Sequence, residues 1–232
     1  MNDQHNPISP RVIVQLLIFI VGIPLLPLLI SRHWHWWEAW VFAALNISVF
    51  AISRILAARR NPDLIAERAN FMQQENIVTW DKQLAFLLAI ISILVMLIAG
   101  LDELYNWSPA YSLPVKVISL IPILLGFVLS SYAFIENRFF SGTVRIQADR
   151  GHQVVSSGPY HWVRHPGYAG GLLTYLATPL LLDSSWTFLP IVFLVLLVVI
   201  RTYLEDRYLQ DQLAGYRDYM KQVPYRLLPG IW

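Results

Sequence analysis

Residues 168–204 read YAGGLLTYLATPLLLDSSWTFLPIVFLVLLVVIRTYL, and this stretch determines much of the fold. It contains two apolar runs, roughly 168–182 and 186–204, which are separated only by Asp183-Ser184-Ser185. A helix needs about 20 apolar residues to cross the hydrocarbon core of a bilayer. So short a break therefore predicts a tight helical hairpin, and its first arm is short for a full span.

Further apolar runs precede this hairpin, and they predict helices over roughly 12–30, 36–56, 83–101 and 115–134. The first run does not end in the small residues of a signal-peptide cleavage site, so we expect it to be retained as a transmembrane helix. The chain is 56% hydrophobic and 14% charged, whereas a soluble domain has about 25% charged residues. The sequence therefore predicts an all-α integral membrane protein with about six transmembrane helices, the last two forming the hairpin.

Lys and Arg gather in three polar segments, which are 58–82, 136–166 and 205–232. With six helices these segments lie on one face of the membrane. The turns on the other face contain a single basic residue, Arg32. Basic loops remain on the cytoplasmic side. We therefore expect both termini in the cytoplasm, in the inner or plasma membrane if the chain is prokaryotic.

The same pattern divides the chain into two parts. Residues 1–135 predict a transmembrane region of four helices, and residues 136–232 predict a C-terminal region that contains a cytoplasmic polar segment, the hairpin and a polar tail. Within the second part, residues 143–155 are typical of a small hairpin or turn.

Composition and missing motifs exclude several classes of function. The net charge of +2 is dispersed, so nothing indicates nucleic-acid binding, and the absence of cysteine excludes disulfides and thiolate chemistry. No dinucleotide-binding glycine fingerprint, P-loop or His-Glu-x-x-His element is present. The histidines form no metal-binding pattern, so we expect no metal. The sequence does not define an oligomeric state.

The stretch 156–171, SSGPYHWVRHPGYAGG, concentrates the residues that could carry chemistry. Pro166 suits the first turn of a helix, whose free backbone N–H groups can bind an anion. Arg164 and His165 stand just before it, and the aromatic walls of such a site would be Tyr160, Trp162 and Tyr168. The alternative is an interfacial anchor, because the same residue types are common where a helix leaves the membrane.

Two further groups follow the hairpin. Arg201 and Glu205 are four residues apart on one helix face and could form an ion pair; the alternative is a snorkelling helix end. In the tail, Tyr216 and Tyr219 share a helical face and could cover a site as an aromatic lid. The alternative is an amphipathic helix on the membrane surface.

The string GPYHWVRHPGYAG, followed by an apolar hairpin and then Glu205-Asp206, resembles the isoprenylcysteine carboxyl methyltransferase and phospholipid N-methyltransferase group. That family carries an Arg-His-Pro-x-Tyr-x-Gly element, an apolar stretch and an acidic pair, often Glu-Glu. The resemblance covers about residues 136–232, which it implies are the cytoplasmic cofactor-binding catalytic region, and this part looks most like bacterial and archaeal members of the family. It implies a membrane-embedded methyltransferase that uses S-adenosylmethionine without a Rossmann domain. It also implies a lipidic or prenylated acceptor that enters from the bilayer.

The resemblance also assigns residues. It implies that Glu205 meets the ammonium or sulfonium end of the cofactor and that Arg201 orients an anionic acceptor, which makes these two the candidate catalytic residues. The candidate cofactor-binding residues are Gly158, Tyr160, Val163, Arg164, His165, Pro166, Tyr168, Gly170, Glu205 and Tyr216.

The acceptor stays open at this point. A carboxylate needs no base and could be positioned by a guanidinium, whereas an amine must lose a proton, which Glu205 or His165 could accept. Two other functions also stay open: a membrane reductase of the sterol-reductase type that uses reduced nicotinamide dinucleotide phosphate, and a non-catalytic membrane scaffold.

Overall fold

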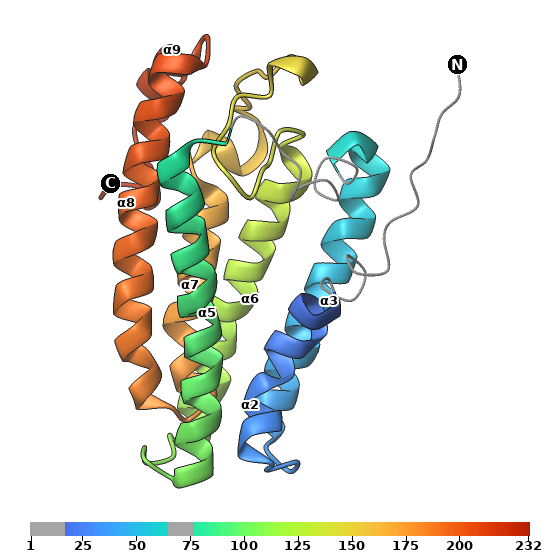
Figure 1. Ribbon diagram of the computed structural model, residues 1–232, viewed down its shortest axis with the longest axis vertical. Coiled ribbons are helices and arrows are strands. Elements are labelled where there is room, and N and C mark those ends of the chain that lie inside the picture. Colours follow the sequence, from blue (N-terminus) through green and yellow to red (C-terminus); the bar gives the residue numbers. More distant parts are fainter. Residues whose placement is uncertain (1–16, 65–76) are drawn as a thin grey trace.

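The computed structural model describes residues 17–64 and 77–232, and these residues form helices and turns without a β-strand. The chain runs upward and downward through a bundle whose longest axis is vertical in Figure 1. The α-helices are α2 (Ile23–Ser31), α3 (Trp37–Arg60), α5 (Thr79–Tyr105), α6 (Leu113–Glu136), α7 (Pro166–Leu181), α8 (Phe188–Gln212) and α9 (Tyr216–Gln222). A π-helical turn, η1 (Ile18–Gly22), leads into α2, and the short 3₁₀ turns are η3 (Ala148–Arg150), η4 (Gly158–His161) and η5 (Ser185–Thr187).

Within residues 17–64 and 77–232, four helices are long and apolar enough to cross a membrane: α3, α5, α6 and Ser185–Gln212, which joins η5 to α8. All four were predicted from hydropathy, although each is longer than its apolar run. The other two predicted spans correspond to shorter helices, α2 with 9 residues and α7 with 16. At 1.5 Å per residue, α7 covers only about 24 Å. Residues 12–16 of the first predicted span lie outside the described residues.

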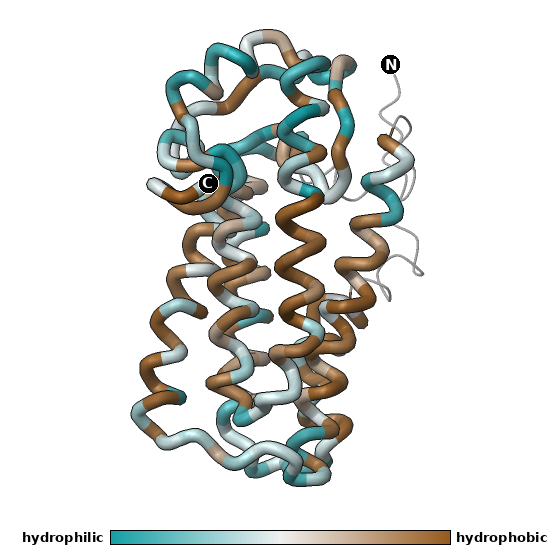
Figure 2. Tube along the Cα trace, turned by 90° about the vertical axis from the view of Figure 1, so that its left-hand side faces the viewer, coloured by the Kyte–Doolittle hydropathy of each residue, from teal (hydrophilic) through white to brown (hydrophobic). Residues whose placement is uncertain are grey.

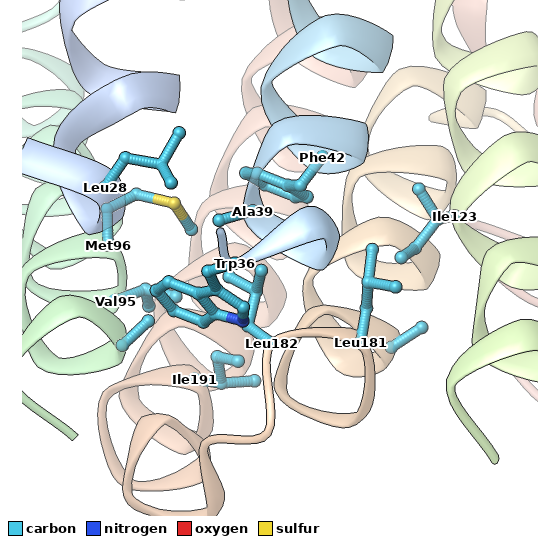
Figure 3. Close-up of a cluster of buried hydrophobic side chains, with 12 residues drawn as sticks. Leu28, Trp36, Ala39, Phe42, Val95, Met96, Ile123, Leu181, Leu182 and Ile191 are labelled. Carbon is cyan, nitrogen blue, oxygen red and sulfur yellow. The ribbon is translucent and has the colours of Figure 1, made fainter. Parts of the chain in front are cut away.

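The middle of the bundle is apolar and its two ends are polar, as Figure 2 shows. The largest buried cluster joins α2, α3, α5, α6, α7 and α8, and Leu28, Trp36, Phe42, Met96 and Leu181 are among its members (Figure 3). Leu28 and Leu181 are fully buried. This cluster lies in the half of the bundle far from α9, so it holds the helices together without occupying the α9 end.

Helices α6 and α7 approach each other closely at two glycines. A Cβ atom built on Gly126 would lie 2.4 Å from the carbonyl oxygen of Gly170, and one on Gly170 would lie 2.5 Å from that of Gly126. Ser130 Oγ also donates a hydrogen bond to the carbonyl of Gly167 at 3.1 Å. Small residues permit this backbone contact in membrane bundles, and it fixes the start of α7 against α6.

A buried polar cluster ties the connections together at the end opposite α9. Lys116, at the start of α6, forms ion pairs with Glu38 and Asp183. The carboxylate of Asp102 accepts hydrogen bonds from the hydroxyls of Ser108 (2.7 Å) and Ser184 (2.6 Å). We call Glu38, Asp102, Lys116, Asp183 and Ser184 the Lys116 cluster.

The α9 end is built from the long connection between α6 and α7 and from the tail. Residues 143–155 contain the turn η3 and no strands, so the turn that the sequence predicted is present and a paired hairpin is not. The backbone N–H of Val78 donates to the carbonyl of Val144 at 3.3 Å, which holds this connection against the start of α5.

Candidate active site

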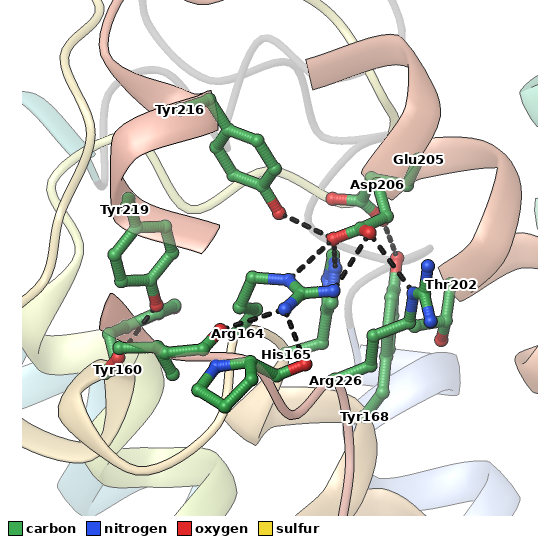
Figure 4. Close-up of polar contacts among 12 residues, drawn as sticks. Tyr160, Arg164, His165, Tyr168, Thr202, Glu205, Asp206, Tyr216, Tyr219 and Arg226 are labelled. Carbon is green, nitrogen blue, oxygen red and sulfur yellow. Dashed lines mark hydrogen bonds and ion pairs between the residues drawn. The ribbon is translucent and has the colours of Figure 1, made fainter. Parts of the chain in front are cut away.

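Asp206, on α8, is the centre of the polar contacts at the α9 end (Figure 4). Its side chain is fully buried and accepts hydrogen bonds from the Arg164 guanidinium at 2.8 and 2.9 Å, from Arg226 Nε at 3.0 Å and from the Tyr216 hydroxyl at 2.8 Å. His165 Nε2 lies 3.3 Å from Oδ1 of the same carboxylate. We call Arg164, His165, Asp206, Tyr216 and Arg226 the Asp206 cluster.

The Arg164 guanidinium binds protein groups on every side. Besides its two bonds to Asp206, Nη1 donates to the carbonyls of Val223 (2.7 Å) and Pro224 (2.8 Å). The backbone N–H groups of Arg164 and His165 donate to the carbonyls of Tyr225 and Arg226, both at 2.9 Å. The sequence suggested an anion-binding end here, but these donors hold the tail instead, because Asp206 and the tail carbonyls satisfy them.

A cleft lies beside this cluster and encloses about 820 Å³, part of it open to solvent. Its walls come from α7, α8, α9 and the connection 137–155, and they include the aromatic side chains of Phe139, Phe140, Tyr160 and Tyr168. Of the predicted cofactor-binding residues, the cleft is lined by Tyr160, Arg164, His165, Pro166, Tyr168, Glu205 and Tyr216.

Glu205 is the acidic side chain in the lining of this cleft. The Tyr168 hydroxyl donates to its Oε2 at 2.6 Å, and the Tyr168 ring stacks on His165 with centroids 5.7 Å apart. Among the described residues, no basic side chain forms an ion pair with Glu205. The neighbouring Asp206 pairs with Arg164 and Arg226. The Glu205 carboxylate therefore faces the cleft with its negative charge.

Arg201 does not pair with Glu205, although the spacing of four residues favoured that contact. Its Nε and Nη2 bind the carboxylate of Asp81 at 2.7 and 3.1 Å, and Nη2 also donates to the carbonyl of Gly142 at 2.7 Å. Arg201 is buried and is not part of the cleft lining. The contact with Asp81 forms because α5 packs beside α8 and places a buried carboxylate at the same height.

Asp81 also accepts the backbone N–H of Val144 at 2.7 Å. The Asp81–Arg201 pair therefore holds residues 142–144, of which Thr143 and Val144 line the cleft. This makes Asp81 a residue that shapes the site from outside it. Its sequence signal is a carboxylate just before the apolar run 83–101, and charged residues at such a place usually face a partner rather than lipid.

The two tyrosines of α9 share a face, as their spacing predicted, and both are buried against the cleft. Tyr216 binds Asp206, and the Tyr219 hydroxyl donates to the carbonyl of Tyr160 at 2.6 Å. Burial and the neighbouring Asp206 carboxylate raise the pKa of Tyr216. Both hydroxyls therefore remain protonated hydrogen-bond donors at neutral pH.

Three predicted cofactor-binding residues and one predicted aromatic wall lie away from the cleft lining. Gly158 has φ +58° and packs against Glu136, and Gly170 forms the helix contact with Gly126. Val163 is buried outside the lining, and Trp162 is 57% exposed. The short interval 158–170 contains a turn and a helix start, so only some of its side chains can face one side.

His152 is a cleft residue that sequence reasoning did not single out. Its ring packs on Phe139 with centroids 4.7 Å apart, and its Nδ1 accepts the N–H of Gln147 at 3.3 Å. Burial, together with the positive charges of Arg145 and Arg150, lowers the pKa of His152 to about 4. The ring is therefore neutral at pH 7.

Residues 115–214, from the start of α6 to just beyond α8, match the family described as Phospholipid methyltransferase. Two relatives named Probable protein-S-isoprenylcysteine O-methyltransferase, from Oryza sativa subsp. indica and subsp. japonica, are each 25% identical over 146 residues, covering 62% of this chain and 71% of the relative. The Delta(14)-sterol reductase TM7SF2 of Mus musculus is 34% identical over 95 residues, covering 40% of this chain and 23% of the reductase.

Proposed function

Because residues 115–214 belong to the phospholipid methyltransferase family, we propose that this protein transfers a methyl group from S-adenosylmethionine to a lipidic or lipid-anchored acceptor. The observation that carries the proposal is Glu205, a carboxylate without an ion-pair partner among the described residues, which faces an aromatic-walled cleft inside the matched region. A cationic ligand fits such a site because carboxylates and aromatic faces both attract positive charge.

The residues suggest a division of roles. Glu205, oriented by Tyr168, faces the positive end of the cofactor, and Phe139, Phe140 and Tyr160 provide apolar walls. S-adenosylmethionine, when bound, supplies a methyl group already activated by its sulfonium. The remaining task of the protein is to align acceptor and methyl group and to exclude water. Arg201, held by Asp81, would act on the wall of the cleft rather than on the acceptor itself.

The acceptor and the orientation are part of the proposal. A carboxylate acceptor would become a methyl ester without losing a proton, whereas an ammonium acceptor would first transfer one, and Glu205 and His165 are the candidates to receive it. Since most basic loop residues of the sequence gather at the α9 end, we place that end in the cytoplasm.

The test is calorimetric titration of the detergent-purified protein with S-adenosylmethionine and, separately, with reduced nicotinamide dinucleotide phosphate. The proposal requires binding of the first and not the second, with binding weakened in Glu205→Gln and retained in Glu103→Gln. Glu103 is a matched control because it pairs with His33 at the opposite end. Binding of the nicotinamide alone would favour a reductase, the activity named for the mouse relative. Radiolabelled methyl transfer to a prenylated cysteine or to phosphatidylethanolamine would then separate the two acceptor classes.

A further inference from the structure

A second hollow lies between α3 and α6 and encloses about 600 Å³. Its lining consists of Asn46, Val49, Phe50, Ser53, Arg54, Phe127, Ser130, Ser131, Phe134 and Phe140. All of these residues except Phe140 belong to helices that are long and apolar enough to cross a membrane. We call this hollow the α3–α6 groove.

The groove exists because α3 contacts α6 at the α9 end and joins the main core farther away. At the α9 end, Asn61 Nδ2 donates to the carbonyl of Ile135 at 2.9 Å, and Arg60 pairs with Glu136 at 2.8 Å. At the other end, Ala39 and Phe42 join the large apolar cluster. Figure 1 shows α3 and α6 beside each other between these two attachments, and the hollow lies between their facing side chains.

Several polar groups of the groove are already satisfied by the backbone. Asn46 Nδ2, Ser53 Oγ and Ser130 Oγ donate to the carbonyls of Phe42 (2.8 Å), Phe50 (2.9 Å) and Gly167 (3.1 Å). The Arg54 guanidinium lies over the rings of Phe50 and Phe134, at 4.3 and 3.8 Å. A hydrocarbon chain could therefore enter the groove without leaving these three hydrogen-bond donors unpaired.

Phe140 connects the two hollows, because it lines both the α3–α6 groove and the cleft beside Glu205. Its ring stands edge-on to Phe134 with centroids 5.5 Å apart. A Cβ atom on Gly167 would lie 3.0 Å from the Phe140 ring, so the missing side chain at Gly167 lets this ring rest on the start of α7. The groove therefore ends where the cleft begins.

We infer that the α3–α6 groove binds the hydrocarbon chain of the methyl acceptor, with the reactive head passing Phe140 into the cleft. The inference rests on the proposed function and specifies the side from which the acceptor enters. The two helices that form the groove also carry exposed apolar residues on other faces, such as Ile52, Ile55 and Val128, so their outer surfaces suit lipid. A chain can thus reach the groove from lipid without leaving an apolar environment.

The chain contains no cysteine, so a cysteine introduced by substitution is the only thiol that a reagent can modify. Ser131→Cys places a thiol in the groove, and Val128→Cys places a control thiol on the same helix at a residue that is 64% exposed and outside the lining. Both variants are treated with dodecyl methanethiosulfonate and assayed with N-acetyl-S-farnesylcysteine as acceptor. We expect the modified Ser131→Cys protein to show at least about a tenfold higher KM for this acceptor, a loss of about 1.4 kcal/mol, with unchanged affinity for S-adenosylmethionine. Equal behaviour of the two modified variants would overturn the inference.

Photolabelling tests the same groove without turnover. A benzophenone-bearing prenylcysteine should crosslink to residues 46–54 of α3 or 127–134 of α6, and excess N-acetyl-S-farnesylcysteine should prevent the label. Labelling confined to other helices would overturn the groove assignment. Failure of S-adenosylmethionine to bind the unmodified protein would instead overturn the proposed function, so the two failures are distinguishable.

Discussion

Two buried charged clusters, one at each end of the bundle, have similar chemistry and different surroundings. In the Lys116 cluster one ammonium bridges Glu38 and Asp183, and in the Asp206 cluster one carboxylate gathers two guanidinium groups and a histidine. The Lys116 cluster lines neither hollow described above, whereas Arg164, His165 and Tyr216 line the cleft. Buried charge is therefore not sufficient to identify a site, and the adjoining cleft with its remaining carboxylate makes the difference.

The strongest test of this comparison is Asp206→Asn. The change leaves the Arg164 and Arg226 guanidinium groups without their shared carboxylate, and breaking a buried ion pair costs about 3–5 kcal/mol. We expect a large fall in the thermal midpoint in detergent together with loss of S-adenosylmethionine binding, because the tail and α9 would separate from the cleft. A variant that stays as stable as the parent would contradict the central place given to Asp206.

Lys116→Met should be nearly as destabilising, because it strands the buried carboxylates of Glu38 and Asp183. Its cofactor affinity, measured on the folded fraction at low temperature, should remain within about twofold of the parent, less than 0.5 kcal/mol. Lys116→Arg, which keeps the charge, serves as the control. A marked loss of affinity in Lys116→Met would mean that the two ends are coupled and that the comparison is wrong.

Glu205→Gln should have the opposite effect to Lys116→Met: it should lower cofactor affinity and leave stability nearly unchanged. Its only hydrogen bond among the described residues is the one donated by Tyr168, and no ion pair depends on it, so the thermal midpoint should change little. We expect affinity for S-adenosylmethionine to fall about tenfold, or 1.4 kcal/mol, in calorimetric titration. Unchanged affinity in Glu205→Gln would remove the main support for the cationic ligand.

The expected effect that is smallest at neutral pH is a pH dependence at His152, which appears only as the pH falls. Its pKa is about 4 in the folded protein and 6.5 ordinarily, so the unfolded chain takes up a proton first as the pH falls. The stabilisation from the neutral ring is complete above pH 6.5 and decreases between pH 6.5 and about 4. His152→Phe, which keeps a ring on Phe139, should flatten the fall of the thermal midpoint across this window. Parallel pH curves for parent and variant would exclude this contribution.

Hydropathy predicted much of the fold because membrane spanning is encoded locally. The four long helices, and the start of α7 at Pro166, follow from apolar length and from proline at a first turn. The short first arm of the hairpin, predicted over 168–182, is α7 (Pro166–Leu181). The first predicted span, 12–30, is less regular than hydropathy indicates, because the π-helical turn η1 precedes the 9-residue α2.

The sequence predicted which residues line the site better than it predicted the contacts between them. The Arg-His-Pro element and Glu205 do line one cleft, as the family resemblance implied. Spacing favoured a local pair between Arg201 and Glu205, but the partner of Arg201 is Asp81, which is 120 residues away in sequence. Asp206 was not among the candidate residues, yet it pairs with Arg164 and Arg226, because α8 directs its side chain toward Arg164 and the tail.

The contacts of Arg164 and Asp206 also set an order of events during synthesis. Both residues are translated before Val223, Pro224 and Arg226, which complete their hydrogen bonds. While residues 223–226 are still inside the ribosome, Asp206 and Arg164 can pair with each other but lack these contacts. The helices can therefore be inserted into the membrane before the cleft walls are complete, because the last contacts of Arg164 and Asp206 form only after residues 223–226 have emerged.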